Sequence, residues 1–384
     1  MEREHTSIYG MILGAIFTCT LLWSAAASAT IPEDKSSAVV FVYQRIGEDA
    51  VPQGNISIEQ FEEHISELKK GGYSVLPLSK IIDAVKSNTP LPPKTVAITF
   101  EGAYQATLAN AVPLLDDAQM PFTVFFSSDE LDDSSTGHMT WDQLKKLKKD
   151  KLAGLGILPA TYEHLVNQTP EKSAELINRA VSRYREMLGE EPDFFAYPYG
   201  EFNNALRKQI GGYKFKAAFG QQSGVVYNGA DLTALPRFTM TDEYGDLDRF
   251  LLTAHALPLP VIDVVPDDMV ITQNPPTIGF TITPELTNLA KLSCFASDTG
   301  KLPLTHIDNN RIEIRLTEAL TDRRTRINCT LPNETFTAGE QPNWRWFGML
   351  LTSPSVEEEA TADSSAEDME GSHDDETPEN PPKK

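Results

Sequence analysis

Residues 95–104 (TVAITFEGAY) decide the fold, because a carboxylate, Glu101, directly follows a run rich in Val, Ile, Thr and Phe. Such a run predicts a β-strand. In a chain that alternates strands and helices, the carboxyl ends of the strands meet at one edge of the sheet, where these folds build their active sites. Glu101 is therefore the first candidate catalytic residue.

The chain from about 38 to about 257 alternates short apolar runs with amphipathic segments. Capping-box patterns at Ser57 and Thr140 mark two helix starts, and Thr169 followed by Pro170 marks a third. The alternation predicts an α/β domain with a largely parallel sheet, either open or closed into a barrel. We expect strands over 38–43, 73–78, 95–100, 121–126, 194–197 and 216–219, and helices over 58–70, 79–86, 110–118, 141–149 and 170–188.

The net charge of −22 argues against a nucleic-acid partner, since such proteins neutralise phosphates with Lys and Arg. Much of this charge lies in residues 355–384, which hold 11 acidic and 2 basic residues. That segment has almost nothing to bury, so we expect a disordered acidic tail.

Residues 1–29 are expected to be a signal peptide, because the apolar run 9–23 precedes small residues that end in Ala27 and Ala29. The protein is then exported, either periplasmic or secreted. An uncleaved membrane anchor is the alternative, since residues 11–29 are nearly long enough to span a bilayer. No second apolar run approaches that length, so the mature protein is not expected to be an integral membrane protein.

The pattern changes near residue 257, after which short alternating runs predict a small immunoglobulin-like β-sandwich. In an exported chain Cys294 and Cys329 are expected to form a disulfide. The predicted domains are a signal peptide (1–29), an α/β domain (30–260), a β-sandwich (261–354) and the tail (355–384). The sandwich strands are expected over 277–282, 290–295, 311–316, 326–331 and 344–351.

Five segments, in this order, resemble motifs of the polysaccharide deacetylases with a NodB homology domain, a carbohydrate esterase family. The resemblance covers about 37–260 and implies a distorted (β/α) barrel that hydrolyses N-acetyl groups of amino-sugar polysaccharides. It also implies a divalent metal, usually zinc, held by one Asp and two His, with a second Asp as general base. The segments are 98–103 (ITFEGA), 139–144 (MTWDQL), 156–165 (GILPATYEHL), 195–200 (FAYPYG) and 234–238 (ALPRF).

The chain departs from the family pattern at the metal-binding positions. Glu101 stands at the general-base position, whereas Gly102 replaces the metal-binding Asp. In an alignment without gaps, Leu158 and Tyr162 replace the two His. Since one surviving ligand does not hold a catalytic zinc, no intact metal site is expected.

Shifting the alignment by two residues places Ala160 and His164 at the two His positions, and His164 becomes a possible remnant ligand. Gln44 follows the first strand where relatives often have His, and Ala196 replaces an Arg of many members. No cofactor is therefore assigned, although zinc or another divalent metal is expected if the protein is active.

The remaining histidines are weaker candidates. His138 precedes the Thr140 helix start and could reach the site, and His255 is also within the α/β segment. His64 lies among glutamates and is predicted to face solvent. A loop with four acidic residues suits either calcium or a solvated turn, of which the turn is favoured: Asp242, Glu243, Asp246 and Asp248.

The resemblance also implies a sugar-binding groove, in which a backbone N–H of the Pro198–Gly200 segment helps to stabilise an oxyanion. Trp344 and Trp346 share a strand face, and either form a carbohydrate platform or pack in the core. Trp141 either stacks on a sugar or packs at its helix start. The substrate-binding candidates are Tyr197, Pro198, Tyr199, Arg237 and Trp141.

Three hypotheses follow. The protein binds or remodels an N-acetylated amino-sugar polysaccharide with little or no hydrolysis, as a possible pseudoenzyme. Alternatively, it is a working N-deacetylase whose metal site is rebuilt from Glu101, His164 and His138. The third hypothesis is a non-catalytic envelope protein that contacts a protein partner through the sandwich and the tail.

Overall fold

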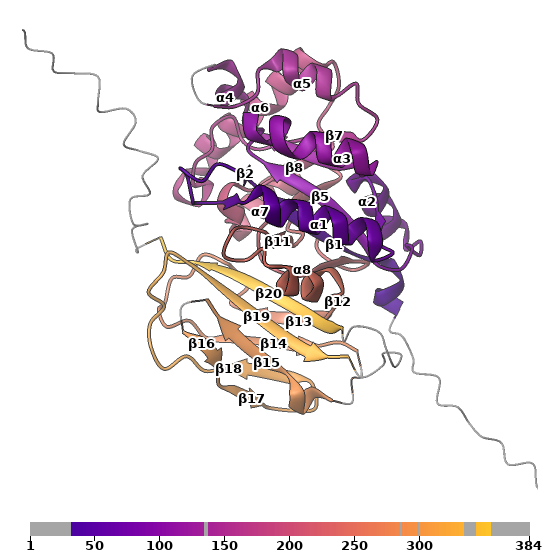
Figure 1. Ribbon diagram of the computed structural model, residues 1–384. Coiled ribbons are helices and arrows are strands. Elements are labelled where there is room, and N and C mark those ends of the chain that lie inside the picture. Colours follow the sequence, from indigo (N-terminus) through magenta and orange to yellow (C-terminus); the bar gives the residue numbers. More distant parts are fainter. Residues whose placement is uncertain are drawn as a thin grey trace, which may run out of the picture. The chain divides into compact units, whose positions relative to one another are not determined.

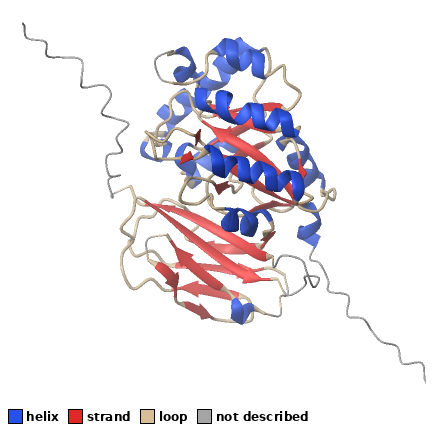
Figure 2. Ribbon diagram, viewed as in Figure 1, coloured by secondary structure: helices blue, strands red, loops and turns tan. Residues whose placement is uncertain are grey.

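The computed structural model describes residues 32–354, except 134–136, 285, 287, 298 and 334–342. The predicted signal peptide and acidic tail lie outside the described residues. The described chain contains an α/β region, followed after residue 254 by a region made almost wholly of strands (Figures 1 and 2). None of the helices in this described part is long and apolar enough to cross a membrane.

The α/β region contains a curled sheet in the order β10-β1-β5-β6-β7-β8-β9, with β11 beside β1 and β4 beside β5. All neighbours are parallel except β1 and β10. The strands are β1 (Ser37–Tyr43), β4 (Ser74–Val75), β5 (Thr95–Glu101), β6 (Phe122–Phe126), β7 (Ala153–Ile157), β8 (Phe194–Ala196), β9 (Ala217–Phe219), β10 (Val225–Tyr227) and β11 (Phe238–Thr239).

A short segment links the two sides of this sheet. Leu235 forms a parallel bridge with Phe219 at the end of β9, and Phe238 in β11 pairs with Phe41 in β1. The sheet therefore curls into the distorted (β/α) barrel that the family resemblance implied. Arg237 lies between the two pairing residues, which fixes its position at the junction.

The helices begin where the capping residues predicted. Ser57 accepts the N–H of Gln60 at the start of α1, Thr140 and Gln143 form a reciprocal capping box, and Thr169 caps α6. The predicted helix over 110–118 instead begins as a π-helical turn, η2 (Thr107–Ala111). The α-helices of this region are α1 (Ile58–Lys70), α2 (Leu78–Ser87), α3 (Val112–Ala118), α4 (Ser128–Asp132), α5 (Trp141–Leu147), α6 (Pro170–Leu188), α7 (Asn204–Gly211) and α8 (Leu247–Ala254).

The second region is a β-sandwich of two sheets, in the orders β12-β20-β19-β15-β16 and β13-β14-β18-β17. The predicted strand over 290–295 begins later, because residues 289–291 form a 3₁₀ turn. The strands are β12 (Leu257–Pro258), β13 (Val261–Val265), β14 (Ile278–Ile282), β15 (Ser293–Ala296), β16 (Gly300–Leu302), β17 (Leu304–His306), β18 (Arg311–Ile314), β19 (Arg324–Pro332) and β20 (Trp344–Thr352).

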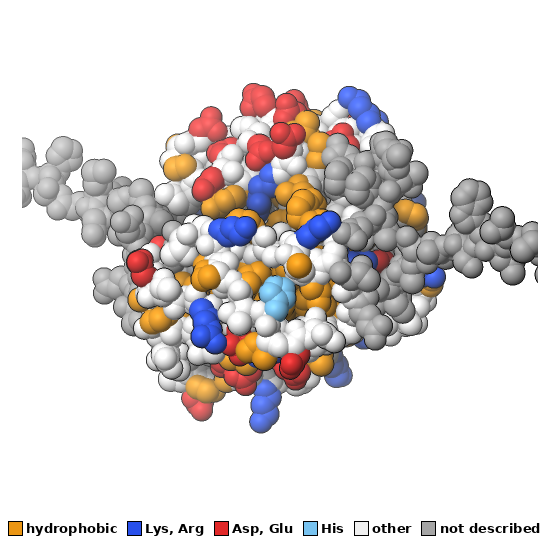
Figure 3. All heavy atoms as spheres, turned by 90° about the horizontal axis from the view of Figure 1, so that it is seen from below, with side chains coloured by type: hydrophobic (Ala, Val, Ile, Leu, Met, Phe, Trp, Pro, Cys, Tyr) orange, Lys and Arg blue, Asp and Glu red, His pale blue; other side chains and the backbone are white. Residues whose placement is uncertain are grey.

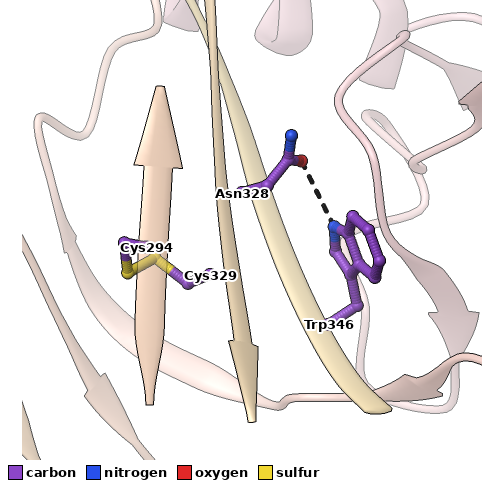
Figure 4. Close-up of a disulfide and its surroundings, with 4 residues drawn as sticks. All are labelled: Cys294, Asn328, Cys329 and Trp346. Carbon is purple, nitrogen blue, oxygen red and sulfur yellow. Dashed lines mark hydrogen bonds between the residues drawn. A yellow bond between two sulfur atoms is a disulfide. The ribbon is translucent and has the colours of Figure 1, made fainter. Parts of the chain in front are cut away.

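The predicted disulfide is confirmed. Cys294 in β15 and Cys329 in β19 stand directly opposite each other within one sheet, and both are buried (Figure 4). They lie in a core cluster that includes Ile278, Phe280 and Ile327.

The sandwich also contacts the α/β region. Trp346 is buried against Phe238 with ring centroids 5.1 Å apart, and its indole N–H donates to Asn328 (Figure 4). Packing is therefore the role of Trp346, in agreement with one of the two alternatives. Because β12 pairs with β20, the sandwich sheet includes residues before 261. The limits of the two domains, 30–260 and 261–354, remain a prediction.

Reduction of the disulfide should lower the free energy of unfolding of the sandwich. The bond spans 35 residues, which in the chain-entropy account is worth about 3–4 kcal/mol. Urea denaturation of wild type and of Cys294→Ala/Cys329→Ala, each with and without reductant, measures this. The reductant should shift only the wild-type midpoint; equal midpoints for the oxidised wild type and the variant would contradict the expectation.

Candidate functional site

Glu101, at the carboxyl end of β5, is fully buried and paired with a fully buried arginine. Its Oε2 lies 2.5 Å from Nη2 of Arg237. Arg237 also donates through Nε to the carbonyl oxygen of Gly220, 2.8 Å away. The predicted general-base carboxylate is therefore half of a buried ion pair.

The second oxygen of Glu101 accepts two further hydrogen bonds. The Tyr162 hydroxyl donates to Oε1 at 2.9 Å, and the Gln221 amide donates to the same atom at 3.0 Å. The Tyr162 hydroxyl in turn accepts from Gln44 at 3.0 Å and from the backbone N–H of Tyr199 at 3.1 Å. Burial, and next the charge of Glu101, raise the pKa of Tyr162 well above its usual value, so the phenol stays neutral.

Gly102 has no room for the aspartate that the family pattern places there. Its φ is +106°, a conformation that L side chains rarely adopt, and an added Cβ would overlap the ring of Tyr104. That ring is fixed on two sides, because Arg45 lies 4.0 Å from its centroid and His138 stacks on it at 4.5 Å. Tyr104 therefore occupies the space that a metal ligand at position 102 would need.

The two expected histidine positions also lack metal donors. Tyr162 points at Glu101, which agrees with the alignment without gaps, and Leu158 is buried in an apolar cluster. In the shifted alignment Ala160 is buried, while His164 turns to Glu201 through Nδ1 at 2.8 Å. Within the described part of the chain no three His, Cys, Asp or Glu side chains are grouped to hold a metal, and the residues at the family's ligand positions do not fit zinc.

Parts of the chain are similar to known proteins. Residues 88–218 match the family model described as polysaccharide deacetylase. A poly-β-1,6-N-acetyl-D-glucosamine N-deacetylase of Escherichia coli K12 is 23% identical over 62% of this chain, and the match covers 43% of that relative. Residues 88–218 of the α/β region are thus similar to the polysaccharide deacetylase family.

Other relatives are equally distant. YxkH of Bacillus subtilis, whose name marks its polysaccharide deacetylase function as unproven, is 24% identical to this chain. The match covers 39% of this chain and 53% of YxkH. Two solved structures share the fold. The deacetylase PplD of Streptococcus pyogenes, in complex with acetate, has a TM-score of 0.52 and 19% identity, and the match covers 57% of this chain and 98% of that one. IcaB from Ammonifex degensii has a TM-score of 0.51 and 21% identity, and the match covers 57% of this chain and 97% of that one. The chain thus matches less than half of the length of the E. coli relative.

The predicted substrate-binding residues of the deacetylase domain differ in exposure. Tyr199, at a left-handed φ of +56°, is partly exposed and stacks on His164 with centroids 3.9 Å apart. Pro198 and Tyr197 are buried, and the Tyr197 hydroxyl donates to the carbonyl oxygen of Thr233 at 2.8 Å. Trp141 is buried at its helix start, so Tyr199 is the only one of the three aromatic candidates with a partly open face.

The prediction that His64 faces solvent is wrong. His64 is fully buried, stacked on Phe250 at 4.0 Å. One ring nitrogen donates to the carbonyl oxygen of Gly245 at 2.8 Å, which leaves Nδ1 to accept from the Tyr43 hydroxyl at 3.0 Å. The physical reason is helical spacing, because position 64 shares the apolar face of α1 with Phe61 and Leu68.

The other histidines and the acidic loop have local roles. His138 pairs with Glu130 at 3.1 Å, and His255 caps α8 near Tyr73, at the opposite end of the sheet from Glu101. Asp242 accepts the N–H of Ser57, and Asp246 is the N-cap of α8.

Residues that sequence analysis missed complete the site. Gln221 and Tyr104 carry no motif signal, and their roles depend on loop conformation. Three arginines at the start of β19 also reach this region: Arg323, Arg324 and Arg326.

Acidification should destabilise the protein through His64. Burial lowers its pKa to about 4, so the folded state resists a proton that the unfolded chain binds at about 6.5. Stability should therefore be complete above pH 6.5 and fall as the pH drops to about 4, by a total on the order of 3 kcal/mol. Chemical denaturation at several pH values, compared with His64→Gln, measures this, and parallel pH profiles for the two proteins would refute it.

Removal of Arg237 should be strongly destabilising, because it leaves Glu101 buried without its cation. We expect Arg237→Met to lower the free energy of unfolding by about 3–5 kcal/mol. The matched control is Arg185→Met, which breaks an exposed pair with Glu191 and should change little. A loss of the same size in both variants would contradict a special role for the buried pair.

Proposed function

We propose that this is an exported protein that binds an N-acetylated amino-sugar polysaccharide on a deacetylase scaffold without hydrolysing it. The single observation that carries the proposal is the commitment of both Glu101 oxygens to Arg237, Tyr162 and Gln221. A general base must be able to take a proton from an attacking water, and both oxygens of this carboxylate already accept hydrogen bonds from protein donors.

Two further features support the loss of hydrolysis. The family mechanism uses a metal-activated water, and Gly102, Leu158 and Tyr162 do not supply its ligands. The backbone N–H of Tyr199, in the segment expected to stabilise an oxyanion, already donates to the Tyr162 hydroxyl. The chemistry that remains is recognition by aromatic faces and amide groups.

The ligand class is supported by the similarity of residues 88–218 to polysaccharide deacetylases and by the name of the E. coli relative, a poly-β-1,6-N-acetyl-D-glucosamine N-deacetylase. Tyr199 and Tyr104 are partly exposed on two sides of the Glu101 network, and each ring is held by a histidine and an arginine. The exposed edges of rings fixed in this way can contact a sugar with little loss of side-chain entropy.

The alternative of a rebuilt metal site has less support. His164 is engaged by Glu201 and His138 by Glu130, and Glu101 is paired with Arg237, so the three donors have separate acidic or basic partners. The alternative of a protein-interaction role involves the acidic tail, which lies outside the described residues; on the face seen in Figure 3 the acidic side chains lie mainly toward two opposite edges, with apolar and basic ones between them.

Export belongs to the proposal through residues 1–29, with their apolar run and small residues at 27 and 29. Purification from the culture medium or the periplasm, followed by amino-terminal sequencing, tests this part.

Measurements of acetate release and of sugar binding distinguish a non-hydrolytic sugar-binding protein from an active deacetylase. Mature protein incubated with β-1,6-linked N-acetylglucosamine oligomers and Zn²⁺, Co²⁺ or Ni²⁺ should release no acetate above the protein-free control. Isothermal titration with the same oligomers should show binding that Tyr199→Asn weakens by about tenfold, since Asn tolerates a left-handed φ but lacks the aromatic ring.

Tyr213→Asn, at an aromatic pair remote from Glu101, is the control and should bind as wild type. Robust metal-dependent acetate release would defeat the non-hydrolytic proposal, and absence of oligomer binding would defeat the binding role.

A further inference from the structure

Strand β19 of the sandwich brings arginines to the deacetylase site. From position 324 its odd-numbered residues are buried in the sandwich and its even-numbered residues face the other way. Arg324 lies with its guanidinium 5.1 Å from the Tyr199 ring centroid, and Arg326 reaches Gln221. The sandwich therefore forms part of the wall of the site.

Several cations approach one carboxylate at this wall. Arg323 and Arg324 both approach Glu201, at 3.4 and 4.0 Å, and His164 uses the same carboxylate. Glu201 is fully buried and serves all three.

Arg326 has no carboxylate within 4 Å among the residues that the structure describes. Its contact is the Gln221 side-chain oxygen, 3.5 Å from Nη2. Gln221 donates with its amide nitrogen to Glu101, so one residue separates Arg326 from the buried carboxylate. An arginine beside a site normally has an anionic partner when it is substantially buried.

A third cation, Arg249 on α8, comes from the α/β domain. Its guanidinium lies over the Tyr244 ring at 5.2 Å, and its Nε is buried without a hydrogen-bond partner within the described residues. Burial and then the charges of Arg324 and Arg249 lower the pKa of Arg326 to about 10, while Tyr244 and the carboxylate of Glu243 act in the opposite direction. These groups thus crowd one another, and an anion between them would relieve the repulsion.

We propose that Arg249, Arg324 and Arg326 form a subsite for an anionic group, a carboxylate or a phosphate, carried by the bound polysaccharide. The inference rests on the proposed sugar-binding function, since Gln221 and Tyr199 place the subsite beside the predicted groove. The planar guanidinium matches the paired oxygens of either anion. The protein then selects an acidic polysaccharide, in which a charged sugar neighbours the one held at Tyr199.

The experiment compares three oligosaccharides of equal length by titration with the full mature protein. One contains N-acetylglucosamine only, one alternates it with glucuronate, and one carries 6-phosphates. We expect at least one acidic oligomer to bind about tenfold more tightly than the neutral one at low salt, with the advantage lost at high salt. The acidic oligomer that binds identifies the anion.

Arg249→Gln/Arg326→Gln should bind the acidic oligomer as weakly as the neutral one, with unchanged affinity for the neutral one. The control Lys172→Gln removes an exposed cation of α6 and should change neither affinity. Because Arg326 has no carboxylate within 4 Å in the described part of the chain, the single variant Arg326→Gln should unfold at a temperature no lower than wild type, whereas a purely structural role would lower it.

Neutral and acidic oligomers of equal affinity would overturn the subsite while leaving the proposed function intact. Binding of neither would overturn the proposed function and the subsite with it. Loss of neutral binding in a folded double variant would show that the arginines act on the groove in general and would also overturn the subsite.

Discussion

The buried pair of Glu101 and Arg237 is the interaction on which the rest of the site depends. Glu101 ends β5 in the middle of the sheet, and Arg237 belongs to the segment that links β9 to β1. The pair therefore ties the centre of the curled sheet to its closing segment. Through Gly220 and Gln221 it also orders the loop after β9, which touches the sandwich. A charge that is expensive to bury thus positions several loops at once.

The same pair holds the carboxylate that the family resemblance assigns to the general-base position. Glu101 accepts from three donors, and one of them, Tyr162, is the residue that the alignment without gaps places at a metal-binding His position. Tyr104 fills the neighbouring space above Gly102. These side chains form a connected buried network around Glu101, in which Nη1 of Arg237 has no hydrogen-bond partner within the described residues.

Local signals predicted much of the fold. Ser57, Thr140 and Thr169 marked helix starts correctly because caps act within one turn. Strand β7 was missed because Gly154 and Gly156 are not typical strand residues. Glycine at 156 allows close packing, since a side chain there would overlap the ring of Phe125. His64 was placed wrongly because neighbouring charges were given more weight than helical spacing. Glu101 was found from its strand end, but Arg237 as its partner and Gln221 as its donor depend on contacts across 136 and 120 residues.

Contacts between the beginning and the end of the described chain mean that the sandwich sheet is completed late. Arg345 in β20 forms two hydrogen bonds with Asp34, 311 positions earlier, and β20 lies between β12 and β19 in its sheet. The sandwich sheet therefore stays incomplete until residues near 352 have been made. A chain synthesised from its amino end must keep the edges of β12 and β19 unpaired until then, which makes the late stage of folding the one most exposed to aggregation.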